Sequence, residues 1–397
     1  MTDRPTIRLR PKIDPRRVRF GFPWVYANEL VTDRRTKAIA PGTIATLEDD
    51  KRQPIATVAV NPNSKIMARV LDRDPNAQID AEWLRVRVER AFALRDRLFD
   101  APFYRLIHAE ADGLPGVVVD RFGDALALQP NAAWADVLSE TLAEVLADVT
   151  GVSAVLKNAS GRARTPEGLD DDSRVLMGGI DGLIPVPMNG ATYMADLTGG
   201  QKTGLFYDQR PNHAFVARLA HGTDVLDVFS HVGGFALAAL AAGATRALSV
   251  DGSRAALDLA EEGARQSGVA DRFETRQGDA FDVLTALGEE GRRFETVICD
   301  PPAFAPNKGA RDAGLRAYER VARLAAPLVA EGGTLTLCSC SHAADLPAFL
   351  NACKRGIGRA GRSAQLLRTG YAGPDHPQHP DLAESGYLKA LSFRLLP

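Results

Sequence analysis

Cysteine is scarce in this sequence, and no apolar run is long. Four cysteines occur among 397 residues, all in the last quarter, which does not make a disulfide framework and favours a reducing cytoplasm. Cys338 and Cys340 lack the C-x-x-C spacing of zinc sites, so no metal site is expected. No apolar stretch reaches membrane-spanning length, and the basic N-terminus lacks the apolar core of a signal peptide, so we expect neither feature.

A large excess of one charge is also missing. The net charge of −2 argues against a globally basic nucleic-acid binder. The charge is unevenly distributed, however, because residues 1–20 hold seven basic and two acidic side chains, a local charge of +5. Such a cluster is either a solvated surface or a surface that contacts phosphates, and charge alone does not decide between them.

The length and the pattern of apolar residues indicate several domains. A chain of 397 residues is too long for one hydrophobic core. Short strand-like segments with turn signals predict a small barrel, followed by a polar linker at residues 72–76. The segments are residues 7–9, 42–47, 55–60 and 66–71.

The next part of the chain predicts an α+β unit, and the last part predicts alternating strands and helices. In the middle we expect helices and strands at residues 81–99, 116–119, 125–129, 133–149, 154–157 and 183–186. From about residue 191 onward, alternation of strand and helix predicts βαβ units and a doubly wound sheet. The predicted domains are therefore residues 1–75, 76–187 and 188–397.

An acid and a thiol follow two of the predicted strands. Residues 297–299 form an apolar strand that stops at Asp300, before two prolines, and the strand at 334–337 runs toward Cys340. Ligands bind outside the carboxyl ends of strands in an open α/β sheet, so we expect both side chains in one crevice. A thiolate that adds to carbon 6 of cytosine makes carbon 5 nucleophilic enough to accept a methyl group.

A glycine turn upstream predicts the site of a methyl donor. The strand at 224–229 runs into a turn at residues 230–235, and Asp251 ends the next strand. Glycines let the backbone approach a ligand, and an acid on the next strand end bonds ribose hydroxyls. The dinucleotide fingerprint G-x-G-x-x-G is absent here. The ordered series of this turn, Asp251, residues 277–281 and Asp300 still favours a nucleotide-like cofactor.

With these motifs in order, the chain resembles the RlmI-like family of bacterial 23S rRNA (cytosine-5) methyltransferases, which use S-adenosylmethionine. The resemblance covers nearly the whole chain. It implies an α/β fold in which a Rossmann-like class I methyltransferase sheet follows a small β-barrel (PUA) domain and an α+β middle domain. It also implies an RNA partner, and it leaves the oligomeric state open, a homodimer included. Besides the motifs above, the matching segments are residues 23–28, 61–64, 109–116, 119–124, 200–206, 207–212 and 339–341.

The resemblance gives each candidate residue a role. Cys340 is the expected nucleophile, and Asp300 is expected to bond the polar edge of the cytosine. The cofactor residues are Phe229, Ser230, Gly233 and Gly234 under the methionine end, Asp251 at the ribose, Asp279 and Phe281 at the adenine, Arg210 at the methionine carboxylate or an RNA phosphate, and Asp300. The expected RNA contacts are Arg8, Arg10, Lys12, Arg16, Arg17, Lys202 and Lys308.

Two other functions stay open at this point. A guanine-directed rRNA methyltransferase would share the fold and the Asp-Pro-Pro segment but would need no thiol. A non-catalytic RNA-binding or assembly factor would keep a vestigial cofactor pocket. Structural roles also compete, because Asp279 and Asp300 are able to cap helices and Phe304 either stacks on the base or fills the core. Cys338 is expected to pack.

Overall fold

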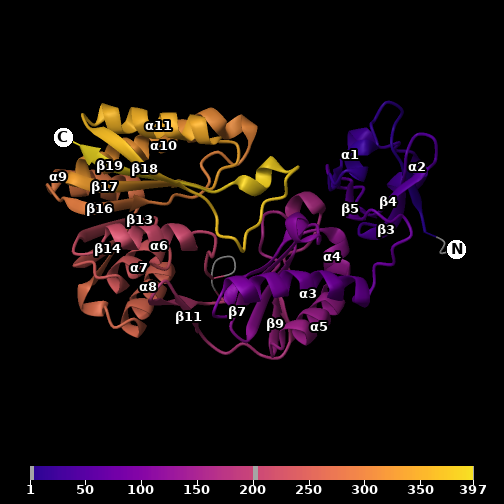
Figure 1. The fold of residues 1–397 in the computed structure, drawn as a ribbon, viewed down its shortest axis with the longest axis horizontal. Coiled ribbons are helices and arrows are strands. Elements are labelled where there is room, and N and C mark those ends of the chain that lie inside the picture. The colour runs from indigo at the N-terminus through magenta and orange to yellow at the C-terminus, as the bar shows by residue number, and fades with distance from the viewer. Residues whose placement is uncertain (1–3, 200–203, 397) are drawn as a thin grey trace. The chain divides into compact units, whose positions relative to one another are not determined.

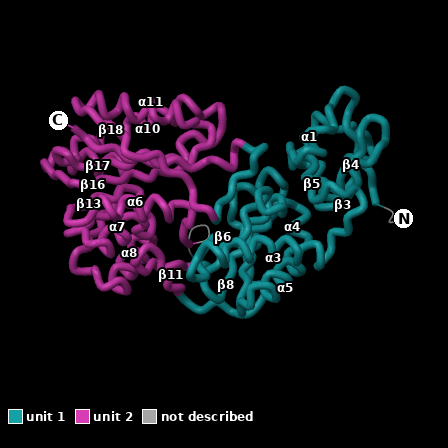
Figure 2. The backbone as a smooth tube through the Cα atoms, in the orientation of Figure 1, with its two compact units in different colours: residues 1–182, 197–203, 375–382 teal, residues 183–196, 204–374, 383–397 magenta. Residues whose placement is uncertain are grey.

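The computed structural model describes residues 4–199 and 204–396 (Figure 1). Contacts between Cα atoms divide the chain into two compact units (Figure 2). Unit 1 holds residues 1–182, 197–203 and 375–382, and unit 2 holds residues 183–196, 204–374 and 383–397. Among the described residues, none of the helices combines the length and the apolarity that a membrane crossing requires.

The first sheet of unit 1 has five strands in the order β1-β3-β4-β5-β2. Ala45 and Leu47 of β3 are buried while their neighbours are partly exposed, because alternate side chains of a strand face opposite sides. This sheet confirms the strands predicted near the N-terminus and adds the short β2. The strands are β1 Thr6–Arg8, β2 Trp24–Val25, β3 Thr43–Glu48, β4 Pro54–Val60 and β5 Ala68–Asp72.

The second sheet of unit 1 has the order β10-β9-β8-β7-β6 and packs against helices. Asp80 caps the first helix by accepting from Trp83 N at 2.9 Å, and the Trp83 ring meets Trp134 edge-on at 6.1 Å. The helix predicted at 133–149 is two helices that meet at Leu138. The elements are α3 Ala81–Leu98, β6 Phe103–His108, β7 Val117–Phe122, β8 Ala125–Pro130, α4 Ala133–Val137, α5 Ser139–Thr150, β9 Ala154–Lys157 and β10 Arg174–Met177.

One predicted strand of the middle domain was placed wrongly. The segment expected at 183–186 is β11 (Ile184–Met188), which pairs with β12 (Ala191–Ala195) inside unit 2. Pro185 and Pro187 cannot donate backbone hydrogen bonds, which suits a strand with a neighbour on only one side. Within unit 1, the strand that pairs with β9 at the edge of the sheet is β10, which was not predicted.

Unit 2 is built on a seven-stranded sheet in the order β15-β14-β13-β16-β17-β19-β18. The strands from β15 to β17 are parallel and β19 is antiparallel to β17, which confirms the predicted doubly wound fold. The elements are α6 Arg210–Leu219, β13 Asp224–Val228, α7 Gly234–Ala241, β14 Arg246–Asp251, α8 Arg254–Gln266, β15 Phe273–Gln277, α9 Ala280–Glu289, β16 Phe294–Cys299, α10 Arg311–Ala325, β17 Val329–Ser339, α11 Leu346–Arg359, β18 Ser363–Gly370 and β19 Lys389–Leu396.

The strand order of unit 2 locates its ligand crevice. From β13 the chain first builds outward through β14 and β15, and it then returns to place β16 on the other side of β13. Ligands of such sheets bind at this switch point, outside the carboxyl ends of the strands. Figure 1 shows α10 and α11 along one side of the sheet and α6, α7 and α8 along the other. The crevice therefore lies at the ends of β13, β16 and their neighbours.

A late segment of the chain belongs to unit 1. The backbone oxygen of Asp375 accepts from the Arg95 guanidinium at 2.9 Å, and its Oδ2 accepts from Arg105 N at 3.1 Å. His376 lies against His108 with ring centroids 5.0 Å apart, and burial lowers the pKa of His108 to about 2. His376 thus packs inside unit 1 as a structural residue.

Candidate active site

The glycine turn after β13 holds a strained backbone. Phe229 and His231 have φ angles of 62° and 50°, which side chains other than glycine rarely adopt, and Gly233 follows at 79°. Strain of this kind persists where the surroundings enforce it and collects at functional sites. Phe229, Ser230, Gly233 and Gly234 therefore lie together at the end of β13, at the switch point of the sheet.

Packing inside the protein requires a glycine at position 234, whether or not a ligand is bound. A Cβ at this position would come within 2.8 Å of the His213 ring on α6. Burial, with a smaller effect of the charge of Arg210, lowers the pKa of His213 to about 3. A neutral imidazole therefore fills the space behind the turn, and Arg210, at the start of α6, lies close to it.

Asp251 ties the turn to the neighbouring strand. Its Oδ2 accepts from His231 N at 2.8 Å, and its Oδ1 accepts from Ser253 N at 2.8 Å. The predicted ribose ligand is thus held by two backbone donors, one of them inside the glycine turn. Its carboxylate is oriented before any ligand arrives, which lowers the entropic cost of binding.

Asp227, in the middle of β13, was missed by the sequence analysis. It is fully buried, and its Oδ2 accepts from Ala236 N at 3.0 Å. Its Oδ1 and the Ser230 hydroxyl have no hydrogen-bond partner among the described residues. Burial raises the pKa of Asp227 to about 7. The signal was available, because an acid inside an apolar strand is costly without a function.

These orphaned oxygens test whether the site fits S-adenosylmethionine. A buried acceptor without a donor costs about 1–3 kcal/mol, so a donor is expected in the functional state. The ammonium group of the methionine moiety is such a donor. The unpaired oxygens of Asp227 and Ser230, next to the oriented carboxylate of Asp251, fit this cofactor.

Asp279 and Phe281 lie beyond β15. Asp279 Oδ1 caps α9 by accepting from Phe281 N at 2.9 Å and Asp282 N at 3.3 Å, so the structural role considered for this acid is present. The guanidinium carbon of Arg320 lies over the Phe281 ring, 4.4 Å from its centroid, and the ring centroids of Phe281 and Phe304 are 6.2 Å apart. The adenine contacts of this pair stay predictions.

Phe304 is the centre of an aromatic cluster. Its ring centroid lies 6.3 Å from Phe229, 6.2 Å from Phe281 and 5.0 Å from Tyr318. The side chain is half-buried and packs against the core of unit 2. It therefore fills the wall between the turn and α10, and its stacking on a base stays a prediction.

Asp300 is oriented by a residue that the sequence analysis did not single out. Its backbone N donates to Val228 O at 3.1 Å, and its Oδ2 accepts from Gln209 Nε2 at 2.9 Å. Gln209 is buried, and its Oε1 accepts from Asn212 Nδ2 at 2.7 Å. Asp300 does not cap a helix here. A glutamine in a loop carries no spacing signal, so only the fold reveals its contact with an acid 91 residues later.

Cys340 is the one cysteine that is partly exposed; Cys299, Cys338 and Cys353 are buried. Its Sγ lies 4.0 Å from Pro301 O, so the thiol and the segment that follows β16 are neighbours. Burial raises the pKa of the other three thiols, which disfavours their thiolates. Cys338 does pack, as predicted, because its side chain is buried in the core of unit 2.

The serines on both sides of Cys340 are fixed by one tyrosine. Ser339 Oγ donates to the Tyr318 hydroxyl at 2.9 Å, and that hydroxyl shares a hydrogen bond of 2.8 Å with Ser341 Oγ. Ser341 Oγ also accepts from Ala305 N at 3.0 Å. The Ser-Cys-Ser segment is thus anchored on α10 and on the loop after β16, and Tyr318 was not predicted for this role.

The predicted RNA contacts of unit 1 have acidic neighbours. Arg8 pairs with Glu48, Arg16 with Asp14 and Arg17 with Glu29, so the local charge of the N-terminal cluster is partly compensated within unit 1. Arg10 Nε donates to Leu30 O at 2.7 Å. Lys12 has a φ of 74°. In unit 2, Lys308 is exposed, and Lys202 lies outside the described residues.

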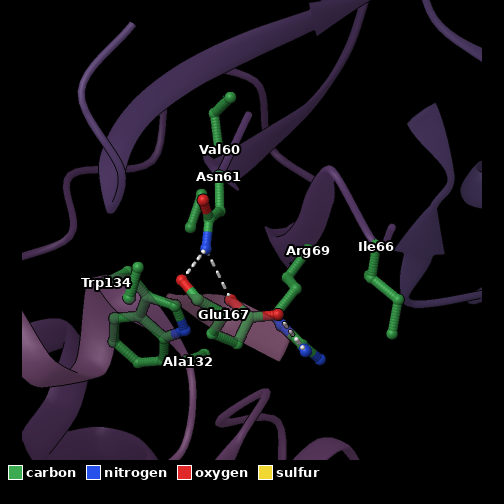
Figure 3. A pocket seen from close by; sticks show the side chains of 9 residues that line it. Val60, Asn61, Ile66, Arg69, Ala132, Trp134 and Glu167 are labelled. Atoms are coloured by element: carbon green, nitrogen blue, oxygen red, sulfur yellow. Dashed lines mark hydrogen bonds and ion pairs between the residues drawn. The ribbon is translucent and has the colours of Figure 1, made fainter. Parts of the chain in front are cut away.

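Unit 1 contains a second buried polar cluster, shown in Figure 3. Glu167 lies at its centre and accepts from Asn61 Nδ2 at 2.9 Å, Ser64 Oγ at 2.7 Å and Arg69 at 3.0 Å. Arg69 also bonds Glu110 at 2.9 Å. The Glu167 carboxylate is satisfied by these three side chains, whereas Arg69 Nε has no hydrogen-bond partner among the described residues. The cluster joins the segment after β4 to the loop before β10.

Comparisons with known proteins agree with this geometry. The family model described as S-adenosylmethionine-dependent methyltransferase matches residues 170–394, and a PUA-like domain model matches residues 7–73. Ribosomal RNA large subunit methyltransferase I of Shewanella amazonensis is 33% identical over 395 residues, covering 98% of this chain and 99% of that protein. The protein of the same name from Cronobacter sakazakii is 31% identical over 383 residues, covering 94% of this chain and 95% of that protein.

Solved structures show the same fold. A proposed SAM-dependent methyltransferase from Streptococcus mutans superimposes with a TM-score of 0.81 at 17% identity, covering 98% of this chain and 100% of that one. A proposed methyltransferase solved in complex with SAH has a TM-score of 0.83 at 18% identity, covering 98% and 99%.

Proposed function

The chain belongs to the S-adenosylmethionine-dependent methyltransferase family, among the relatives of ribosomal RNA large subunit methyltransferase I. From that premise, we propose that it methylates carbon 5 of a cytosine in large-subunit ribosomal RNA. In this proposal the reaction passes through a covalent adduct on Cys340. One observation carries the choice of base and mechanism. Cys340 is the only partly exposed thiol of the chain, and it lies beside the Asp-Pro-Pro segment at the ligand crevice.

The covalent step uses groups that the crevice brings together. The Cys340 thiolate adds to carbon 6, and the electron pair of the ring double bond moves toward carbon 5 and ring nitrogen 3. Asp300, oriented by Gln209, bonds the polar edge of the base and shares a proton with nitrogen 3. Carbon 5 then takes the methyl group, a base removes the carbon 5 proton, and the bond between carbon 6 and sulfur breaks to return the thiolate.

S-adenosylmethionine supplies the electrophilic methyl group. Asp227 and Ser230 would bond its ammonium group, and Asp251 would bond its ribose. Phe229 and Gly233 shape the turn beneath the methionine end. His231 N, in the glycine turn, holds Asp251, and Ala236 N, in the first turn of α7, holds Asp227, so both acids are oriented by the segment that the cofactor approaches.

The RNA part of the proposal rests on the PUA-like domain and on the relatives. A base inside a helix cannot reach Cys340, so the target cytosine must leave its stack or lie in a single-stranded loop. The match to a PUA-like domain over residues 7–73, together with the name of the relatives, supports binding of structured ribosomal RNA by unit 1.

Trapping with 5-fluorocytosine tests the mechanism. A substrate RNA with this base has no removable proton at carbon 5 after methylation, so the adduct should persist. We expect a protein–RNA band that survives denaturation for the wild type and for Cys338→Ser, and none for Cys340→Ala. Because Cys338 lies two residues earlier and is buried, it is a matched control. A band that Cys340→Ala keeps would overturn the nucleophile, and methylated guanine without any band would overturn the choice of base.

A further inference from the structure

Lys389 is a buried lysine next to the Cys340 segment. It is the first residue of β19 and pairs in register with Ser339 of β17. Its side chain is only 4% exposed, and its Nζ donates to Ser341 O at 2.7 Å. The ammonium group therefore contacts the backbone of the residue that directly follows Cys340.

The charge of this lysine lacks a carboxylate partner. Among the residues that the structure describes, no aspartate or glutamate lies within ion-pair distance of its Nζ, and Ser341 O is its one hydrogen-bond acceptor. The nearby Asp345 is engaged elsewhere, since it caps α11 at Ala348 N (2.8 Å) and pairs with Arg311 at 3.1 Å. A buried charge without compensation is strongly destabilising, so the site favours an anion near Lys389.

We propose that the buried ammonium of Lys389 stabilises the thiolate of Cys340, which makes Lys389 the positioning residue that activates the nucleophile. An ordinary thiol is mostly protonated at neutral pH, and a neighbouring cation shifts it toward the thiolate. The proton leaves the partly exposed sulfur for water, and Lys389 keeps its own protons, so that the product is an ammonium–thiolate pair of zero net charge.

Among the described residues, the other ionisable groups that we find acting electrostatically on, or lying beside, Cys340 or Lys389 do not supply this positive charge. Tyr318 faces Cys340 from α10, Asp300 follows β16 beside it, Asp345 precedes α11, and Cys338 lies within β17. All four are neutral or negative. Burial lowers the pKa of Lys389 to about 8, while Cys340 and Asp345 act in the opposite direction. The lysine is thus mostly charged at neutral pH, and more so beside a thiolate.

Alkylation of Cys340 as a function of pH tests this inference. The wild type would be treated with iodoacetamide from pH 5.5 to 9.5, and the Cys340 peptide would be quantified by mass spectrometry. We expect a midpoint at least about one pH unit below the ordinary thiol value of about 8.5. Lys389→Met should raise the midpoint by about one unit or more, which slows alkylation at pH 7 about tenfold, and Lys389→Arg should restore part of the difference.

Lys157→Met is the matched control. Lys157 is equally buried, at 3% exposure, but it pairs with Asp136 at 2.8 Å in unit 1, so its loss should leave the Cys340 midpoint unchanged. A wild-type midpoint near 8.5, or an identical midpoint in Lys389→Met, would overturn the inference. If Lys389→Met does not fold, a wild-type midpoint near 8.5 still overturns the inference, and a midpoint in Lys389→Arg that equals the wild-type value, where partial loss is expected, also counts against it.

The inference rests on the proposed role of Cys340 as nucleophile, but the two fail separately. Alkylation requires no RNA and no methyl transfer. A low midpoint without any trapped RNA would refute the proposed function and leave the activated thiol standing. Trapped RNA with a midpoint near 8.5 would refute only the role of Lys389.

Discussion

Glu167 in unit 1 and Asp227 in unit 2 are both buried carboxyl groups, at 4% and 0% exposure, but their surroundings are opposite. Glu167 accepts from three side chains, one of them the guanidinium of Arg69. Asp227 accepts from the backbone N of Ala236 and keeps its Oδ1 without a partner among the described residues. A group that maintains the fold has its hydrogen bonds completed by the protein, whereas a group that awaits a ligand does not.

The largest effect should come from Glu167→Gln, which removes one partner of a buried ion pair. Because Ser64 and Asn61 would then face an amide, and Arg69 would keep only Glu110, we expect unfolding of unit 1 to become easier by about 3 kcal/mol. Denaturant unfolding followed by hydrogen exchange of β4 would measure this loss. The affinity for S-adenosylmethionine should not change. If Glu167→Gln lost as much affinity as Asp227→Asn, the contrast between a structural carboxyl group and a ligand-binding one would be wrong.

Asp227→Asn is the same chemical change at the open cluster and should act with the opposite sign on stability. The folded pKa of about 7 lies above the ordinary value of 3.8, so this acid stabilises the fold at low pH and that stabilisation is lost as pH rises from about 4 to about 7. The asparagine has no such dependence and still accepts from Ala236 N. We expect the variant without cofactor to be more stable at pH 8 by about 1–3 kcal/mol.

Cofactor binding by the same variant completes this test. Replacing the carboxylate should weaken binding of S-adenosylmethionine about tenfold to a hundredfold, because a charge-assisted hydrogen bond is lost. Calorimetry and melting curves from pH 5 to pH 8 would measure both effects. A variant that melts earlier than the wild type at pH 8 would make Asp227 a structural residue like Glu167.

The residues at the strand ends of unit 2 were predictable from the sequence, whereas the residues that position them were not. Asp251, Asp300 and Cys340 directly follow or end apolar strands, and the ends of parallel strands meet at one edge, so their neighbourhood was readable. Gln209 lies in the matching segment 207–212 but received no role from that match, and Tyr318 and Lys389 are distant in sequence from the residues they contact. These contacts therefore appear only in the fold. The linear count of charges near the N-terminus was incomplete for the same reason, because Glu29 and Glu48 approach it only after folding.

Tyr318→Phe should have an intermediate effect, confined to unit 2. The ring stays in the aromatic cluster, but the hydroxyl that bonds Ser339 and Ser341 is removed. We expect the free energy of unfolding to fall by about 1–2 kcal/mol. Because Cys340 is then less firmly positioned, we expect the methylation rate constant to fall about tenfold and the affinity for S-adenosylmethionine to stay the same. Single-turnover kinetics would separate the two, and an unchanged rate would show that the serines need no anchor.

The smallest effect should come from neutralising Arg8, Arg10, Arg16 and Arg17 together. If all four arginines were free to bind phosphates, the slope of log RNA affinity against log salt would fall by close to one for each arginine neutralised. Three of them pair with acids of unit 1, and Arg10 bonds a carbonyl, so each phosphate contact must compete with a partner that is already present. We therefore expect the slope of log affinity against log salt to fall by about one or two rather than four. Filter binding from 50 to 300 mM salt would measure it, with Arg254 and Arg265 of α8, which also pair with acids, neutralised as the control. An unchanged slope would mean that the acids compensate this cluster completely and that the RNA follows another surface.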